Sequence, residues 1–248
     1  MRALLFVLLG LLSVPRVGSG EEVTVFAAAS LADALEEIAR GYERSSGNRV
    51  VLNVGATSDL ARQIKAGAGA DLFLSADRAQ MDGLTEAGLV RDADRIELLS
   101  NVLVVVVPSG APTRIGAPAD LARLGRIALA DPEAVPAGVY ARTYLEAIGL
   151  WSSLRDRVVP TLNVRAALAA VESGNVDAGI VYRTDAALSR RVRIAYTVPP
   201  ESGPKIVYVL APLASPRKGA ALDLARRLAG PEARTIFEKY GFQVLAAR

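Results

Sequence analysis

Apolar runs and helical patterns alternate along most of the chain. Short runs of apolar and β-branched residues predict strands at Val23–Phe26, Val50–Val54, Leu72–Leu74, Val102–Val107, Ile127–Ala130, Ala178–Tyr182 and Ile206–Leu210. Apolar residues at helical spacing predict helices at Leu31–Tyr42, Leu60–Ala66, Arg78–Ala87, Tyr140–Ile148, Arg165–Glu172 and Ala220–Leu228. Strands that alternate with helices favour parallel sheets covered by helices, so the pattern predicts the α/β fold class.

Two turn-rich stretches, Pro108–Pro112 and Val198–Pro204, flank the middle of the chain. They are either surface loops of a single domain or the places where the chain crosses to a second lobe and returns. Two crossings would form a hinge, with a ligand bound in the cleft between the lobes. In that arrangement we expect lobe 1 to hold residues 21–99 plus 206–248, and lobe 2 to hold residues 100–205.

The amino terminus has the layout of a secretory signal. Arg2 precedes the apolar run Ala3–Leu12, and the small residues Gly18, Ser19 and Gly20 follow it. The run is too short to span a bilayer, and no cysteine follows it that could carry a lipid anchor. We therefore expect residues 1–20 to be a signal peptide and the remaining chain to be periplasmic, with an uncleaved anchor as the alternative.

Composition removes several classes of function. The chain contains neither histidine nor cysteine, which excludes Ser-His-Asp and Cys-His nucleophiles, histidine metal sites and disulfides. Without Arg2 and Arg16, 27 basic residues face 26 acidic ones. This balance gives no argument for nucleic acid or membrane partners.

Four predicted helix starts offer candidate chemistry. Ser30 ends the first apolar run, and we expect it to cap the helix that follows. Thr57 begins a second cap, Pro136 lies near the start of a third helix, and Asn163 is placed to cap a fourth. Each amino end carries roughly half a positive charge and unpaired N–H groups. Singly they are ordinary caps, but converging from two lobes they would suit a small dianion.

Other polar residues are weaker candidates. Tyr182 ends an apolar run, so its hydroxyl either emerges at the carboxyl end of a strand, where ligands of α/β folds gather, or packs under the sheet. Arg165 and Arg183 are possible anion ligands, although most arginines of this kind are solvated or paired with carboxylates.

At these residues the chain resembles the periplasmic molybdate-binding proteins of ATP-driven molybdate uptake systems. The similar stretches follow one another in family order across nearly the whole chain after residue 20: Val25–Leu31, Leu60–Ile64, Ala70–Asp77, Asp131–Glu133, Val135–Gly138 with Tyr140, Gly179–Tyr182 and Lys239–Phe242. The resemblance implies a two-lobed type II periplasmic-binding fold with a mixed sheet in each lobe and the ligand in the interlobe cleft.

The resemblance also implies the ligand and its donors. Molybdate or tungstate would be held through its oxygens, with no direct coordination of the metal and no cofactor, by Ser30, Thr57, Ala137, Val164 and Tyr182. Thr57 stands where the family usually has serine, so Ser58 is an alternative source of the hydroxyl. We expect a monomer that delivers the oxyanion to an ABC-type permease by hinge closure.

Three alternatives remain open at this point. The first is a binding protein for another tetrahedral oxyanion such as sulfate. The second is an enzyme on the same fold that uses Ser30 or a carboxylate; the absence of histidine and cysteine argues against it, and we expect no catalysis. The third is a secreted structural protein without a ligand.

Overall fold

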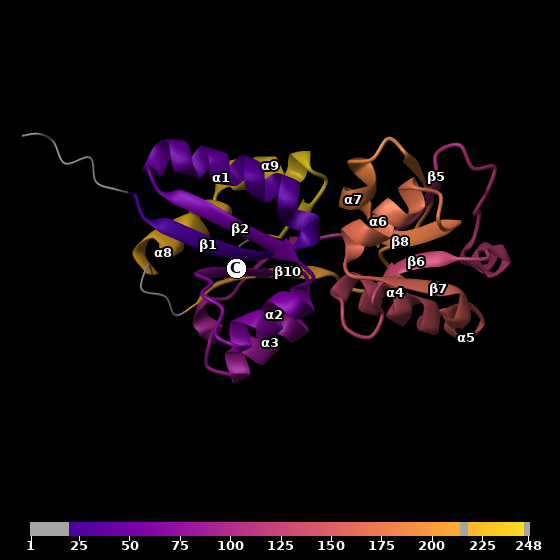
Figure 1. The fold of residues 1–248 in the computed structure, drawn as a ribbon, viewed down its shortest axis with the longest axis horizontal. Helices are drawn as coiled ribbons and strands as arrows, with labels where there is room; N and C mark the ends of the chain where they lie inside the picture. The colour runs from indigo at the N-terminus through magenta and orange to yellow at the C-terminus, as the bar shows by residue number, and fades with distance from the viewer. Residues whose placement is uncertain (1–19, 214–217, 246–248) are drawn as a thin grey trace, which may run out of the picture.

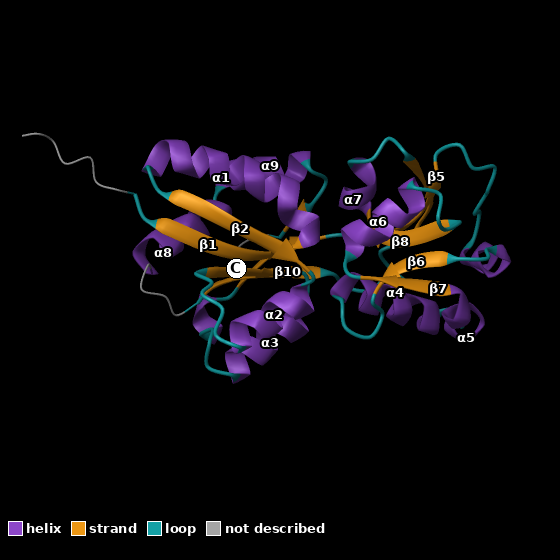
Figure 2. Cartoon of the chain, viewed as in Figure 1, coloured by secondary structure: helices purple, strands orange, loops and turns teal. Residues whose placement is uncertain are grey.

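The fold consists of two sheets, each with helices on both faces, joined by two connections (Figures 1 and 2). The structure is a computed structural model that describes residues 20–213 and 218–245. Strands and helices alternate along most of this range, which confirms the predicted α/β class. Apart from Gly20, the predicted signal peptide lies outside the described residues.

The first lobe is built on a six-stranded sheet with the order β11-β4-β10-β3-β1-β2. Its strands are β1 (Glu22–Ala28), β2 (Arg49–Gly55), β3 (Leu72–Ser75), β4 (Ile96–Ser100), β10 (Val207–Pro212) and β11 (Gln243–Val244). Strand β1 runs parallel to β2 and β3, whereas β10 is antiparallel to β3 and β4. The sheet is therefore mixed.

Helices cover both faces of this sheet, and the strand sequences show why. Side chains of a strand alternate between the two faces. Val25 and Ala27 pack into the core under α1 (Ala32–Ser46), α8 (Lys218–Leu228) and α9 (Pro231–Lys239). Phe26 and Phe73 pack on the other face, with α2 (Thr57–Lys65) and α3 (Arg78–Glu86). A strand buried on both faces needs a continuous apolar run, which is the pattern seen in the sequence.

The second lobe has a five-stranded sheet with the order β7-β6-β8-β5-β9. Its strands are β5 (Leu103–Pro108), β6 (Ile127–Ala130), β7 (Val158–Thr161), β8 (Ala178–Tyr182) and β9 (Val192–Thr197). Helices α4 (Pro136–Ala147) and α5 (Trp151–Leu154) lie on one face, and α6 (Val164–Glu172) and α7 (Arg183–Ala187) on the other (Figure 1).

Both lobes also contain short 3-10 turns. These are η1 (Ala29–Leu31) and η2 (Asp92–Asp94) in the first lobe, and η3 (Pro118–Arg123) and η4 (Arg155–Arg157) in the second.

Two adjacent segments connect the lobes. The chain passes from β4 to β5 through Asn101 and Val102, and returns from β9 to β10 through residues 198–206. The segments lie side by side, since Ser100 Oγ donates to the carbonyl of Ile206 at 2.8 Å. We propose lobe boundaries between residues 99 and 100 and between residues 205 and 206, next to these connections.

The stretch Pro108–Pro112 is not a crossing. It is a turn that follows β5 within the second lobe, where the N–H of Ala111 donates to the carbonyl of Pro108 at 3.0 Å. Of the two turn-rich stretches, only residues 198–204 join the lobes. Proline and glycine mark a turn but do not say whether the chain leaves its sheet there.

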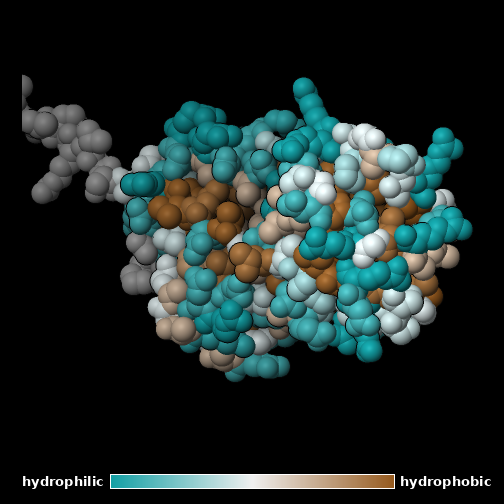
Figure 3. Space-filling view, turned by 45° about the vertical axis from the view of Figure 1, so that its right-hand side comes forward, coloured by the Kyte–Doolittle hydropathy of each residue, from teal (hydrophilic) through white to brown (hydrophobic). Residues whose placement is uncertain are grey.

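Figure 3 shows one face of the molecule, on which apolar patches lie between hydrophilic ones. Within the described residues, no helix combines the length and the apolar character needed to cross a bilayer.

Candidate functional site

The five predicted donors line one small cavity between the lobes. Residues of the β1–η1 and β2–α2 junctions form one side, and the starts of α4 and α6 with the end of β8 form the other. Ser30 and Thr57 come from the first lobe; Ala137, Val164 and Tyr182 come from the second. The strands end at this point and the helices begin, so backbone N–H groups converge on the cavity.

Ser30 does not cap a helix, contrary to the sequence prediction. Residues Ala29–Leu31 form a 3-10 turn, and α1 starts at Ala32 without a side-chain cap. Ser30 Oγ instead makes a hydrogen bond of 2.9 Å with the hydroxyl of Tyr208. Ser30 nevertheless lines the cavity, and the bond from Ala32 N–H to the Ala29 carbonyl closes the turn that contains it.

Thr57 is better placed than Ser58 to reach a ligand. It is the first residue of α2 and lines the cavity, and its Oγ1 accepts from the N–H of Ala76 at 3.2 Å. That bond occupies an acceptor lone pair and leaves the hydroxyl proton free to donate. Ser58 is buried, and its Oγ has no hydrogen-bond partner among the described residues, but the residue does not line the cavity.

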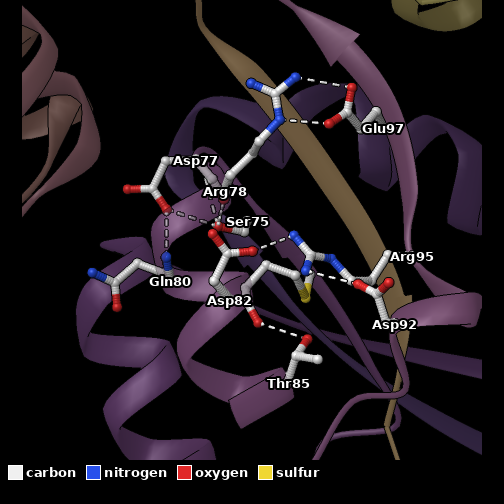
Figure 4. Close-up of polar contacts among 10 residues, drawn as sticks. Ser75, Asp77, Arg78, Gln80, Asp82, Thr85, Asp92, Arg95 and Glu97 are labelled. Carbon is white, nitrogen blue, oxygen red and sulfur yellow. Dashed lines mark hydrogen bonds and ion pairs between the residues drawn. The ribbon is translucent and has the colours of Figure 1, made fainter.

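The loop that carries Ala76 is fixed by its polar neighbours (Figure 4). Asp77 caps α3 by accepting from the N–H of Gln80 at 2.9 Å, and Ser75 Oγ donates to the carbonyl of Asp77 at 2.6 Å. Arg78 extends this network with a two-bond pair to Glu97 on β4. The wall of the cavity at Ala76 is thus held by bonds within the first lobe.

In the second lobe, helices α4 and α6 begin at the cavity. Pro136 is the first residue of α4, so the N–H of Ala137 in the second position has no acceptor within the helix. Asn163 caps α6 as predicted, with its Oδ1 accepting from the N–H of Ala166 at 3.0 Å. Val164 follows as the first helical residue, and its N–H is likewise unpaired within the helix.

The hydroxyl of Tyr182 gives the strongest indication that the cavity binds a ligand. The side chain is 1% exposed, and its hydroxyl has no hydrogen-bond partner among the described residues. A buried polar group without a partner costs about 1–3 kcal/mol. Burial, and secondarily Tyr208 nearby, raises the pKa of Tyr182 well above its ordinary value, so the phenol stays protonated and is a donor.

The cavity is compact and uncharged. None of the residues that line it has a charged side chain. Its volume is about 10 Å³, whereas pockets for drug-sized ligands measure roughly 300–1,000 Å³. Hydroxyl and N–H donors around so small a space suit a compact anion. Within the described residues, no cluster of three or more Asp and Glu side chains forms a metal site.

The sequence profile of a known family covers most of the chain. The family described as "Bacterial extracellular solute-binding protein" matches residues 23–243. The chain belongs to this family.

This solute-binding protein is similar to one relative in sequence and to one solved structure in fold. It is 40% identical to the molybdate-binding protein ModA of Escherichia coli (strain K12) over 229 residues, which is 90% of this chain and 89% of that protein. The substrate-binding domain of a putative molybdenum ABC transporter from Clostridium difficile has a TM-score of 0.71 at 30% identity, covering 92% of this chain and 100% of that one.

A third relative shows that the fold does not decide the ligand. The sulfate-binding protein SubI of Mycobacterium tuberculosis H37Rv has a TM-score of 0.81 at 22% identity, covering 91% of this chain and 87% of that one. It shares the two-lobed architecture only. The ligand of this solute-binding protein must therefore be argued from its own cavity.

Of the two arginines considered as anion ligands, Arg165 is paired with two carboxylates. Arg165 donates to Asp33 at 2.7 Å, and its Nε lies 2.5 Å from Asp185 Oδ1. Arg183 is exposed and does not line the cavity. Neither arginine is therefore placed as an anion ligand.

Asp185 provides a test of this paired cluster. Burial raises the pKa of its carboxyl to about 6, against the opposing effect of Arg165. The folded protein then binds a proton up to about pH 6 that the unfolded chain releases near pH 4. The Asp185 carboxyl therefore adds to the free energy of unfolding at low pH, and this contribution is lost as the pH rises from about 4 to about 6.

We expect Asp185→Asn to remove this dependence. The unfolding free energy of the wild type minus that of the variant should fall by up to ~3 kcal/mol between pH 4 and pH 7. Urea unfolding at the two pH values measures it. A difference that stays constant with pH would contradict the assignment.

Sequence analysis missed a polar chain behind the cavity. Tyr208 of β10 contacts Ser30, and Asn101 Nδ2 donates to both Thr184 Oγ1, at 2.9 Å, and Tyr208 Oη, at 3.3 Å. Asn101 lies in one connection between the lobes, so this chain links the hinge to Ser30. A tyrosine inside an apolar strand was the one available signal, and its partners are distant in sequence.

Proposed function

We propose that this chain is an extracytoplasmic solute-binding protein that captures molybdate and delivers it to an ABC-type permease. The observation that carries the proposal is the Tyr182 hydroxyl, which is buried without a hydrogen-bond partner among the described residues and belongs to a residue that lines the compact, uncharged cavity. The similarity to the Escherichia coli molybdate-binding protein supports the identity of the ligand.

In this proposal, five residues bind the oxygens of the oxyanion. Ser30, Thr57 and Tyr182 donate from their hydroxyls, and Ala137 and Val164 donate from backbone N–H groups. Helix amino ends at the cavity supply partial positive charge, so a dianion is stabilised without Lys or Arg. The metal atom is enclosed by its own oxygens and contacts no side chain.

The donor set predicts which oxyanions are rejected. Hydrogen phosphate carries a proton that requires an acceptor, and the cavity offers chiefly donors. Molybdate, tungstate and sulfate carry no proton at neutral pH. Sulfate is smaller, and each buried donor that it fails to reach costs about 1–3 kcal/mol. We propose that the site accepts molybdate and tungstate and discriminates against sulfate by size.

Capture proceeds by closure of the lobes. Donors come from both lobes, so the bound oxyanion favours the state in which they lie together, and only this preference shifts the equilibrium. The closed form then presents a surface to the permease. We further propose that the protein is a periplasmic monomer, with residues 1–20 removed as a signal peptide, no cofactor, no nucleic acid partner and no catalytic activity.

The decisive experiment is a calorimetric titration of the purified protein with molybdate, tungstate, sulfate and phosphate. We expect tight binding of the first two, sulfate binding weaker by on the order of 100-fold if two donors are left unpaired, and none of phosphate. Sulfate binding as tight as molybdate binding would favour the alternative, a general binding protein for tetrahedral oxyanions. No binding of any of the four would refute the proposal.

A further inference from the structure

One ion pair joins the two lobes beside the cavity. Arg165, the second residue of α6, donates from Nη2 to Asp33 Oδ2 at 2.7 Å, and Asp33 lies in the first turn of α1. Every other ion pair seen in residues 20–213 and 218–245 lies within one lobe. Arg165 therefore makes a connection that opening of the lobes would break.

The guanidinium is held on the second lobe independently of the first. Its Nε lies 2.5 Å from Oδ1 of Asp185, whose side chain is fully buried in α7. The Asp33 and Arg165 side chains remain 45% and 27% exposed, respectively. At neutral pH the Asp185 carboxylate thus holds the guanidinium within the second lobe, whereas Asp33 is solvated when the lobes separate.

The three charged residues belong to the elements that carry the proposed donors. Arg165 follows Val164 directly, Asp33 lies three residues after Ser30, and Asp185 lies three residues after Tyr182. Helix α6 also packs against the η1 turn that contains Ser30. The ion pair can form only when these donor-bearing elements approach each other.

We propose that Arg165 is a positioning residue that holds the closed state: anchored on Asp185 in the second lobe, it binds Asp33 of the first lobe on closure and slows release of the oxyanion. This inference rests on the proposed function. Arg165 does not line the cavity and its charge is matched by carboxylates, so it acts on the lobes and not on the ligand.

The kinetics of binding separate this role from a general structural one. A contact made only after closure changes the dissociation rate and leaves the association rate unaltered. We expect Asp33→Asn to raise the molybdate dissociation rate about two- to fivefold, measured by stopped-flow displacement with tungstate. Added salt should accelerate dissociation from the wild type more than from the variant, because it screens the ion pair.

Two controls isolate the contact. Glu36→Gln removes a carboxylate from the same helix, where Glu36 pairs only with Arg40 within the first lobe, and should leave the dissociation rate unchanged. In a double-mutant cycle, Asp33→Asn should have no further effect once Arg165→Gln is present. An effect of Asp33 on its own helix end would persist in that background.

Failure of the inference differs from failure of the proposed function. A wild type that does not bind molybdate refutes the proposed function. A wild type that binds molybdate, with Asp33→Asn releasing it at the wild-type rate, refutes the role of Arg165. Equal effects of Asp33→Asn with and without Arg165→Gln would refute it as well.

Discussion

Tyr182→Phe should weaken molybdate binding about 10- to 100-fold without lowering the unfolding free energy of the ligand-free protein. The phenol is buried and has no protein partner among the described residues, so the fold gains nothing from its hydroxyl. Phenylalanine keeps the ring and its edge-on contact with Tyr208, at 6.0 Å between centroids. A charged ligand loses one hydrogen bond, which accounts for the size of the effect.

The matched control is Tyr42→Phe, for which we expect the opposite result. Tyr42 is equally buried, but its hydroxyl donates to the carbonyl of Ala220 at 3.3 Å and accepts from Asn48 at 2.9 Å, away from the cavity. Its loss should cost about 1 kcal/mol of stability and leave affinity unchanged. Calorimetry and urea unfolding of both variants measure the two quantities. Wild-type affinity in Tyr182→Phe would remove this residue from the donor set.

Interior strands could be predicted from sequence because burial on both faces requires continuous apolar runs. Every predicted strand and helix is present, with ends shifted by up to four residues. The missed strands lie at or near sheet edges. Strand β7 contains Pro160, which an edge tolerates, and β9 contains Arg193 on a partly exposed face. An edge strand packs on fewer neighbours, so its sequence carries a weaker apolar signal.

The location of the site could be predicted because helix starts follow strand ends in the sequence itself. The roles of individual polar groups could not. Ser30 bonds Tyr208, 178 positions away, and Thr57 bonds the backbone of Ala76. Arg165, considered from sequence as an anion ligand, pairs with Asp33, 132 positions away. These bonds depend on how sheets and lobes come together, which local pattern does not encode.

Gly138→Ala should destabilise the protein by about 3 kcal/mol or more and weaken molybdate binding. Gly138 is the third residue of α4, next to Ala137, and a Cβ there would lie 2.0 Å from the carbonyl oxygen of Ala130 and 2.5 Å from that of Asp131. Both obstacles are backbone atoms that a rotamer change cannot remove. The start of α4 must move away from the end of β6, and the N–H of Ala137 moves with it.

Gly41→Ala is the matched control, since Gly41 also lies within a helix, α1. Its Cβ would meet only the end of the Arg227 side chain, at 3.5 Å. Alanine there should stabilise the protein by up to ~1 kcal/mol through helix propensity. Urea unfolding and calorimetric titration compare the two variants. If Gly138→Ala matches the wild type in expression, in free energy of unfolding and in molybdate affinity, then α4 does not need this close approach to β6. If Gly138→Ala fails to fold while Gly41→Ala folds, the result agrees with the expected loss of stability, because close packing of α4 against β6 places the N–H of Ala137 at the cavity.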